Sequence, residues 1–328
     1  MTYFHRSRRA LVLGLLGCAA LAIAHPANAQ EWPAAKPITV LGPAAVGGPL
    51  DTLLRITSDF VSRKIGQTIV VEPRTGGAGV VVNQFVARQP ADGYVVGAVY
   101  TSHVINPHVT RNLSYDALED FTPVTMLATA NLVLVAATNT PYSDVAELIK
   151  YAKSHPEKVS VGGAQGGAAQ FGFESFRMAA NMPAAFIPYR GEVPALQDVI
   201  GGNLSVAVVG VGAAMPLVTT GKVKLLASFM DKRIASLPDT PSVGEALPGF
   251  KPLTAWYGIV VRAGTPQAIV DRLAAEYRAA VQDPAVKARL ESAGLTTVGS
   301  SPAQFASQIK AEYDVYGELV RKTGFTTN

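Results

Sequence analysis

The stretch GPAAVGGPLDTLLR, Gly42 to Arg55, places two glycines, a proline and an acid between a strand-like and a helix-like segment. Before it, KPITVLGP is largely apolar and flanked by prolines, which is typical of a buried strand. After it, leucines and other apolar residues recur near helical spacing up to Gly66. The stretch therefore predicts a strand, a glycine turn and a helix that begins at Pro49.

The same order recurs along the chain. TIVVEP leads into the glycine turn and helix pattern of RTGGAGVVVNQFVARQ, and GYVVGAVYT follows as a third strand. Further on, KVSVGGAQ runs into a second glycine cluster, GGAQGGAAQF, Gly162 to Phe171. Alternating strands and helices of this kind favour parallel βαβ units. Ligands of such sheets bind beyond the carboxyl ends of the strands, where we expect both glycine turns to lie.

A second set of elements begins near Leu127. It contains the strand patterns NLVLVAAT, AAFIPY, LSVAVVG and VKLLASF, with a helix that has Ser143 as its N-cap and another helix in VPALQDVIGG. Three helical patterns with proline near each start follow at residues 266–282, 284–293 and 302–322. Two α/β sets in one chain predict two lobes with a ligand cleft between them.

The first residues are typical of an export signal. Arginines at positions 6, 8 and 9 precede the apolar run ALVLGLLGCAALAIA and the cleavage pattern ANA at 27–29. We therefore expect a signal peptide over residues 1–29 and a periplasmic protein that begins at Gln30. A retained membrane anchor, twin-arginine export through SRRALVL, and lipidation at Cys18 in LLGC are the alternatives.

Without residues 1–29 the chain has 299 residues, a formal charge of +1 and no cysteine. The near-neutral charge argues against a nucleic-acid partner, and the lack of cysteine excludes disulfides and thiol chemistry. The remaining histidines show neither triad nor metal-ligand spacing, and the motifs G-x-S-x-G and H-E-x-x-H are absent. The sequence predicts a binding protein with no catalytic residue, metal or cofactor. A periplasmic hydrolase is the competing enzyme hypothesis.

Several motifs together resemble one family. They are GGPLD, RTGGAGVVV, PADGY, YDALEDFTPVT, IPYRG, PDTPSVGEA and AGTPQAIVDRL, in that order. The set resembles the Bug-type extracytoplasmic receptors of tripartite tricarboxylate transporters over essentially the whole chain after the signal. The resemblance implies an α/β periplasmic binding protein, type II-like, in which each lobe is a mostly parallel sheet flanked by helices. It implies lobe 1 from residues 30–130 plus 253–328, and lobe 2 from residues 131–252.

The resemblance also implies a partner and a role. A monomer would capture a small organic anion in the inter-lobe cleft and deliver it to a membrane permease. A ligand-bearing sensor that docks to a membrane kinase is an alternative that the sequence does not separate from a transport receptor.

Two segments depart from the family's pattern. Where relatives carry serines and a histidine, this chain has GGAQGGAAQF, with Gln170 near the histidine's place. The strand LSVAVVGV also lacks the acids that relatives often have. We therefore expect a less polar wall and a ligand with an apolar body, since unpaired ligand hydroxyls would be penalised there. Aromatic dicarboxylates such as terephthalate come first, and aliphatic ones such as adipate second.

A bare turn ahead of a helix can bind a carboxylate through backbone N–H groups, and glycine lets the anion approach. The candidate ligand-binding residues are Gly47, Gly48, Pro49, Asp51, Gly77, Thr101, Ser102, Gly163, Gln165, Gly166, Gly167, Ala168, Tyr189 and Gly210. Structural interpretations compete with this. The glycines can simply make tight turns, Asp51 can pair with Arg55, and Tyr189 and Arg190 can buttress the cleft. His103 is more typical of a core or rim histidine.

Cleavage before Gln30 is directly testable. Protein recovered from the periplasm of an expressing host should give an intact mass for a chain that begins at Gln30, because the ANA pattern supplies small residues at the cleavage site. A mass that includes diacylglycerol on Cys18 would contradict this prediction.

Overall fold

The computed structural model describes residues 32–44, 46–234 and 236–325. The predicted signal peptide, residues 1–29, lies outside the described residues. The chain divides into two units, residues 1–36 and 37–328, and every strand and helix described belongs to the second unit. Within the described part, no helix combines the length and the apolar composition needed to cross a bilayer.

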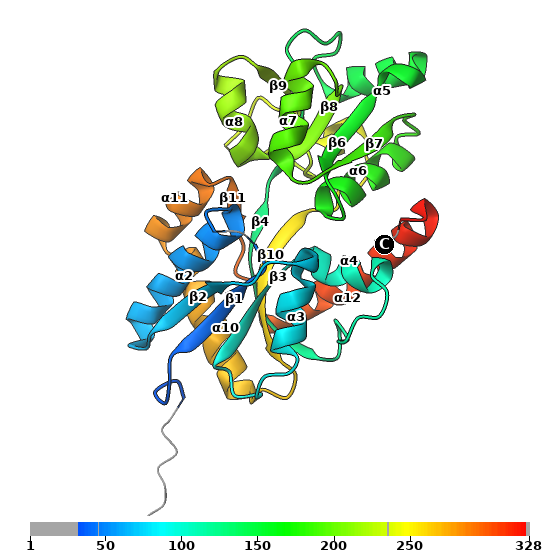
Figure 1. Ribbon diagram of the computed structural model, residues 1–328. Coiled ribbons are helices and arrows are strands. Elements are labelled where there is room, and N and C mark those ends of the chain that lie inside the picture. The colour runs from blue at the N-terminus through cyan, green and yellow to red at the C-terminus, as the bar shows by residue number, and fades with distance from the viewer. Residues whose placement is uncertain (1–31, 45, 235, 326–328) are drawn as a thin grey trace, which may run out of the picture. The chain divides into compact units, whose positions relative to one another are not determined.

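Two β-sheets organise this unit (Figure 1). The first sheet has the strand order β11-β4-β10-β3-β1-β2. Its strands are β1 (Ile38–Gly42), β2 (Ile69–Pro73), β3 (Val95–Tyr100), β4 (Phe121–Ala130), β10 (Ala255–Arg262) and β11 (Leu295–Thr297). The second sheet has the order β7-β6-β8-β5-β9. Its strands are β5 (Leu132–Ala137), β6 (Ser160–Ala164), β7 (Ala185–Tyr189), β8 (Val206–Gly210) and β9 (Val223–Ser228).

Helices flank both sheets, so the predicted α/β class is confirmed. The α-helices are α2 (Pro49–Ile65), α3 (Val80–Val86), α4 (Ser102–Val109), α5 (Val145–Ser154), α6 (Ala168–Ala179), α7 (Glu192–Gly201), α8 (Val211–Thr219), α9 (Val243–Ala246), α10 (Gln267–Gln282), α11 (Pro284–Ser292) and α12 (Pro302–Thr323). The described residues also form the short 3₁₀ segments η2 (Gly77–Gly79) and η3 (Pro156–Lys158). The last three α-helices lie where the proline-led patterns predicted them.

Both sheets are mixed rather than mostly parallel, which corrects the sequence expectation. Pairing is parallel for β1 with β2 and β3, and for β6 with β7 and β8. The pairs β10–β3, β10–β4, β11–β4, β5–β8 and β5–β9 are antiparallel. The reason is the chain's path between the sheets. A single residue, Asn131, separates β4 from β5, and β10 returns beside β4, so the two run side by side between the sheets in Figure 1.

One helix start also differs from expectation. The N-cap of α5 is Asp144, whose carboxylate accepts the N–H of Glu147. The hydroxyl and N–H of Ser143, the predicted cap, instead donate to the Glu147 carboxylate at 2.7 and 2.8 Å. The true cap lies one residue later because Asp144 has the extended backbone that an N-cap requires.

An aromatic contact joins α6, which begins beside the second sheet, to the core that includes first-sheet residues. Phe171 in α6 is fully buried and lies edge-on to Tyr316 of α12 and to Phe325, with ring centroids 5.8 and 5.4 Å apart. The same cluster contains Leu41 of β1 and Val260 of β10. Phe171 therefore helps to hold α6 in place.

Removing this ring should destabilise the protein. Phe171→Ala leaves a cavity in a packed aromatic cluster and should lower the free energy of unfolding by about 3–5 kcal/mol. Denaturant unfolding measures this. The matched control is Met178→Ala in the same helix, whose side chain is exposed and should have little effect. Equal effects of the two substitutions would contradict the packing role.

Candidate ligand-binding site

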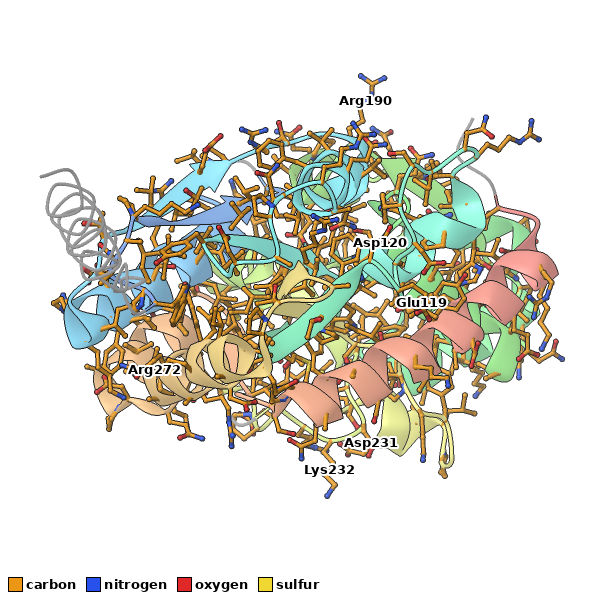
Figure 2. The ribbon with its side chains drawn as sticks, turned by 90° about the horizontal axis from the view of Figure 1, so that it is seen from below. Glu119, Asp120, Arg190, Asp231, Lys232 and Arg272 are labelled. Carbon is orange, nitrogen blue, oxygen red and sulfur yellow. The ribbon has the colours of Figure 1, made fainter. Side chains whose placement is uncertain are left out.

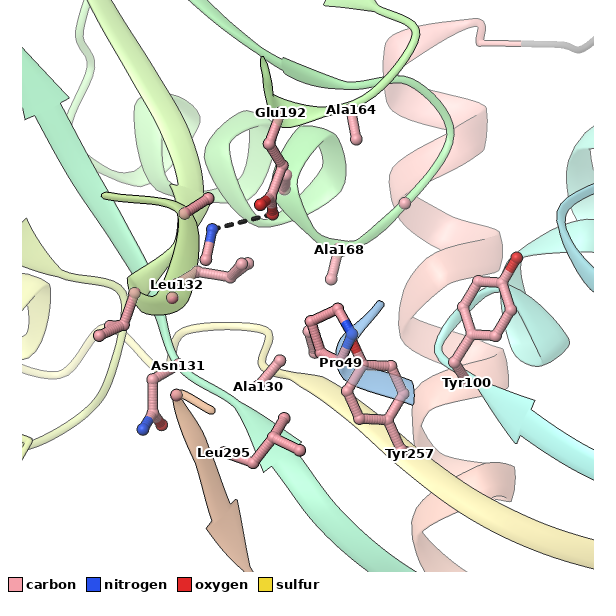
Figure 3. Close-up of a pocket in the computed structure, with 18 of the residues that line it drawn as sticks. Pro49, Tyr100, Ala130, Asn131, Leu132, Ala164, Ala168, Glu192, Tyr257 and Leu295 are labelled. Carbon is pink, nitrogen blue, oxygen red and sulfur yellow. Dashed lines mark hydrogen bonds between the residues drawn. The ribbon is translucent and has the colours of Figure 1, made fainter. Parts of the chain in front are cut away.

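Residues from both sheets line a cavity of about 390 Å³ (Figure 3). That volume is within the range of small-molecule sites. The lining residues are Pro49, Tyr100, Thr101, Ala130, Asn131, Leu132, Ala164, Gly167, Ala168, Ala169, Glu192, Gly210, Val211, Gly212, Ala213, Ala255, Trp256, Tyr257, Ala293, Gly294 and Leu295. Most are small or apolar. Among the described residues, the lining includes no lysine or arginine, and Glu192 is its one acid.

Three helices begin at this cavity. They are α2 after Gly48, α6 after Gly167 and α8 after Gly210. Since each of these N-caps is a glycine, none offers a side chain to the N–H groups of its own first turn. The first N–H groups of a helix have no partner within the helix, and the helix dipole makes that end partly positive. Backbone groups thus supply the positive potential that an anion needs, without a cationic side chain.

The turn before α2 is held from behind by Asp51. Gly47 has a positive φ of 86°, and its N–H donates to Asp51 Oδ2 at 3.0 Å. Arg55 Nε donates to the same oxygen at 3.0 Å, which is the predicted i,i+4 pair. Asp51 is buried, and neither it nor Gly47 and Gly48 belongs to the cavity lining. Only Pro49 of this turn reaches the lining, at the first position of α2.

The turn before α6 is built in the same way. Gly166 has a φ of 71°, and its N–H donates to Oε1 of Gln170 at 2.8 Å. Gln170 thus accepts the glycine N–H of this turn as Asp51 accepts that of the first turn. In both turns the accepting side chain lies four residues after the glycine. Gly167 and Ala168 line the cavity, whereas Gly166 and the exposed Gln165 do not. Gly163 is buried in β6, where a Cβ would stand 3.0 Å from the Val208 carbonyl oxygen, so it is needed for strand packing.

The glycine turn near Gly77 lies outside the cavity lining. Its carbonyl at Ala78 accepts hydrogen bonds from Ser102 Oγ at 2.7 Å and Asn106 Nδ2 at 2.9 Å. Ser102 therefore holds this turn to α4. Its neighbour Thr101 does line the cavity, and Thr101 Oγ1 accepts the N–H of Trp256 at 3.1 Å.

Of Tyr189 and Arg190, Tyr189 buttresses the second sheet in this structure and Arg190 does not. The Tyr189 hydroxyl donates to Asp198 at 2.6 Å, and this bond raises the pKa of Tyr189 to about 12. A Cβ on Gly162 would meet the Tyr189 ring at 2.7 Å, so the ring packs over the glycine strand. Arg190 is exposed and projects away from the molecule in Figure 2. Neither residue lines the cavity.

His103 occupies the core, as its sequence context suggested. It is fully buried, and its ring nitrogens contact Asn83 Nδ2 at 2.9 Å and the Ala117 carbonyl at 3.0 Å. Burial lowers the pKa of His103 to about 4, so it is neutral at physiological pH. Among the residues that the structure describes, no group of three or more histidine, cysteine or acidic side chains could hold a metal ion.

Of the predicted residues, the cavity brings together Pro49, Thr101, Gly167, Ala168 and Gly210. Sequence reasoning missed Tyr100, Asn131, Glu192 and Tyr257, which also line it. The signal for Glu192 was weak but present. The acid directly follows the motif PYRG and begins a helical pattern, which forms α7 in the structure.

Glu192 makes this wall more polar than expected. Its Oε1 accepts the Gly210 N–H at 2.8 Å, so a carboxyl group stands at the end of β8 although the strand itself carries none. Burial raises the pKa of Glu192, and the Gly210 N–H acts in the opposite direction. The pKa of Tyr257 is also raised, first by burial and then by the nearby Glu192 charge. The hydroxyl-poor wall therefore still contains an acid.

The fold and this cavity define an α/β solute receptor of the periplasmic binding protein class. The family described as "Tripartite tricarboxylate transporter family receptor" matches residues 53–325, and the chain belongs to this family. The resemblance drawn from the motifs is thereby confirmed. A curated relative, the UPF0065 protein in the tcbD-tcbE intergenic region of Pseudomonas sp. (strain P51), is 32% identical over 87% of this chain and 85% of its own length.

Solved structures agree. R. palustris Rpa4515 with adipate is 29% identical, with a TM-score of 0.78, over 90% of this chain and 99% of the other. MatC (Rpa3494) from Rhodopseudomonas palustris with bound malate is 28% identical, with a TM-score of 0.73, over 88% of this chain and 99% of the other. The chain is thus a solute-binding receptor of a family that binds small carboxylates.

Asp51 and Gln170 hold the two glycine turns, but only Asp51 can titrate, so we expect their contributions to stability to depend differently on pH. Asp51→Ala removes the acceptor of the Gly47 N–H and one partner of the half-exposed Arg55, and should cost about 1–2 kcal/mol at pH 7. The Arg55 hydrogen bond and the Gly47 N–H lower the pKa of Asp51 below its usual 3.8. This contribution is therefore present above pH 3.8 and lost as the pH falls through the lowered pKa.

Denaturant unfolding between pH 7 and pH 3 tests this. The gap between wild type and Asp51→Ala should shrink below about pH 4. Gln170→Ala is the matched control, since it removes the equivalent hydrogen bond without a titrating group. A gap for Asp51→Ala that stays constant down to pH 3 would show that the carboxylate charge is irrelevant to the turn.

Proposed function

We propose that this protein is an extracytoplasmic receptor that captures a small dicarboxylate with an apolar body for a tripartite tricarboxylate-type permease. Terephthalate is the first candidate ligand and adipate the second. The observation that carries the proposal is the meeting of three helix starts, those of α2, α6 and α8, at one largely apolar cavity whose described lining has no lysine or arginine. No described side chain caps α2 or α6.

The cavity suits a dianion whose two charged ends are joined by a largely apolar body. Carboxylates match the free N–H groups at the starts of α2 and α6. Alanines 164, 168, 169 and 255, together with Leu132 and Leu295, offer apolar contact to the body of the ligand. Two relatives of known structure hold adipate and malate, which are both dicarboxylates. Glycine and alanine in the α6 turn leave room for a flat ring.

The receptor's setting follows from the same proposal. Residues 1–29 would direct the chain to the periplasm and be removed. Residues 30–130 with 253–328 would form one lobe, and residues 131–252 the other, each carrying one of the two sheets. As a monomer, the receptor would release its ligand to the permease. A sensor that presents the same ligand to a membrane kinase is the second candidate, and it would use the same cavity.

A melting scan with candidate ligands tests the capture function. A ligand at a hundredfold excess over its Kd should stabilise the protein by about 2.7 kcal/mol, which raises the melting temperature. Terephthalate and adipate should do so, and citrate should do so much less. Gly167→Asp should abolish the shift, because it brings a negative charge to the start of α6.

Two variants distinguish the loss of the binding site from a loss of stability. Gly167 has an ordinary φ, and a Cβ added there would meet no atom within 4 Å, so Gly167→Asp should melt without ligand as wild type does. Gly201→Asp, the same change at an exposed glycine at the end of α7, is the control and should keep the ligand shift. A strong citrate shift with none from the dicarboxylates would refute the apolar-body argument. Normal ligand binding by Gly167→Asp would refute the α6 turn as a site.

A further inference from the structure

The described lining of the cavity includes one carboxyl group. Glu192 is the first residue of α7, and it follows Gly191, whose φ is 107°. Figure 3 shows its side chain reaching across to the Gly210 turn, where Oε1 accepts the backbone N–H at 2.8 Å. An acid is unexpected in a cavity that is otherwise suited to anions, because it repels the group that the three helix ends attract.

The position of this carboxyl group depends on the glycine that it contacts. A Cβ at Gly210 would stand 3.3 Å from Glu192 Oε1 and 3.5 Å from Oε2. The missing side chain therefore lets both oxygens lie directly against the backbone of the turn. This is the close approach that a bound carboxylate would make at such a position.

Glu192 differs from the residues that hold the other two turns. Asp51 and Gln170 accept glycine N–H groups from behind, outside the cavity lining. Glu192 accepts the Gly210 N–H from within the lining. At this turn the next N–H, that of Val211, already donates to the Asn131 carbonyl at 2.9 Å. At α8 the protein itself thus pairs the N–H groups of Gly210 and Val211, whereas α2 and α6 keep ends that no described side chain caps.

We propose that Glu192 determines how many carboxylates the ligand can have. Its side chain occupies the place that a third ligand carboxylate would take at the α8 turn, so the site admits dicarboxylates and repels tricarboxylates. This inference rests on the proposed capture of a dicarboxylate, and it adds the residue that sets the limit.

Three ring compounds that differ at one position test it. Terephthalate has two carboxylates, trimellitate adds a third at ring position 2, and 2-aminoterephthalate has an amine there instead. Isothermal titration calorimetry would compare wild type, Glu192→Gln and Glu192→Ala. Glu192→Gln keeps an acceptor for the Gly210 N–H and removes the charge, while Glu192→Ala also empties the place. Glu157→Gln, at an exposed acid in η3, controls for the change in net charge.

Trimellitate should bind both Glu192 variants at least about tenfold more tightly than it binds wild type, which corresponds to about 1.4 kcal/mol. Terephthalate should change by less than about threefold, and Glu157→Gln should behave as wild type. Since Glu192→Gln preserves size and hydrogen bonding, its unliganded melting temperature should stay close to that of wild type.

Two results would overturn the proposal. One is an unchanged trimellitate affinity in both Glu192 variants. The other is tighter binding of 2-aminoterephthalate than of terephthalate by wild type, lost in Glu192→Gln, which would make Glu192 a subsite for a hydrogen-bond donor on the ligand. Failure of terephthalate and adipate to bind wild type counts against the proposed function instead, because the trimellitate comparison decides the role of Glu192 by itself.

Discussion

The structure depends on keeping helix N-termini open at one cavity while their turns stay rigid. A glycine turn without support would exchange among many backbone conformations, since glycine restricts φ so little. Here Gly47 and Gly166 are each fixed by a side chain four residues later, Asp51 and Gln170, which bond to the glycine N–H from outside the lining. The following N–H groups remain for a ligand. Rigidity and an open end are therefore supplied by different residues.

The path of the chain brings these turns together. Asn131 is the single residue between β4 and β5, its N–H donates to the Gly294 carbonyl, and its own carbonyl accepts from Val211. At the same place the backbones of Gly212 and Gly294 approach so closely that a Cβ on Gly294 would stand 2.9 Å from Gly212 N. Segments distant in sequence thus meet at the cavity because small residues let their backbones touch.

Charge in the described lining of the cavity is balanced without cationic side chains. Helix ends act as partial positive charges that need no titratable group, and they are offset by the carboxyl group of Glu192. Such a site binds through fixed dipoles, which do not have to reorganise around the ligand. Its preference then depends on where this acid stands, and that is a property of α7 and of Gly210 together.

The sequence alone determined those elements and turns that local patterns encode, but α4 and α8 were not among its predictions. Local patterns placed the start of α2 at Pro49, the proline-led helices at the chain's end, and the pairing of Asp51 with Arg55, because each depends on neighbours within one turn. The ordered motifs also indicated the family, which the similarity to known receptors confirmed.

Tertiary structure decided which candidates face the cavity. The Tyr189 hydroxyl donates to Asp198, and the Ser102 hydroxyl donates to the Ala78 carbonyl. Gly163 is needed for strand packing. No local pattern encodes these contacts, because the partners lie on other elements. Glu192 and Gly210 are 18 residues apart and meet only because β8 ends beside the start of α7. The antiparallel pairing of β4 with β10 arises because the chain passes from the first sheet to the second and later returns beside its own path. Strand patterns in the sequence do not contain this long-range constraint.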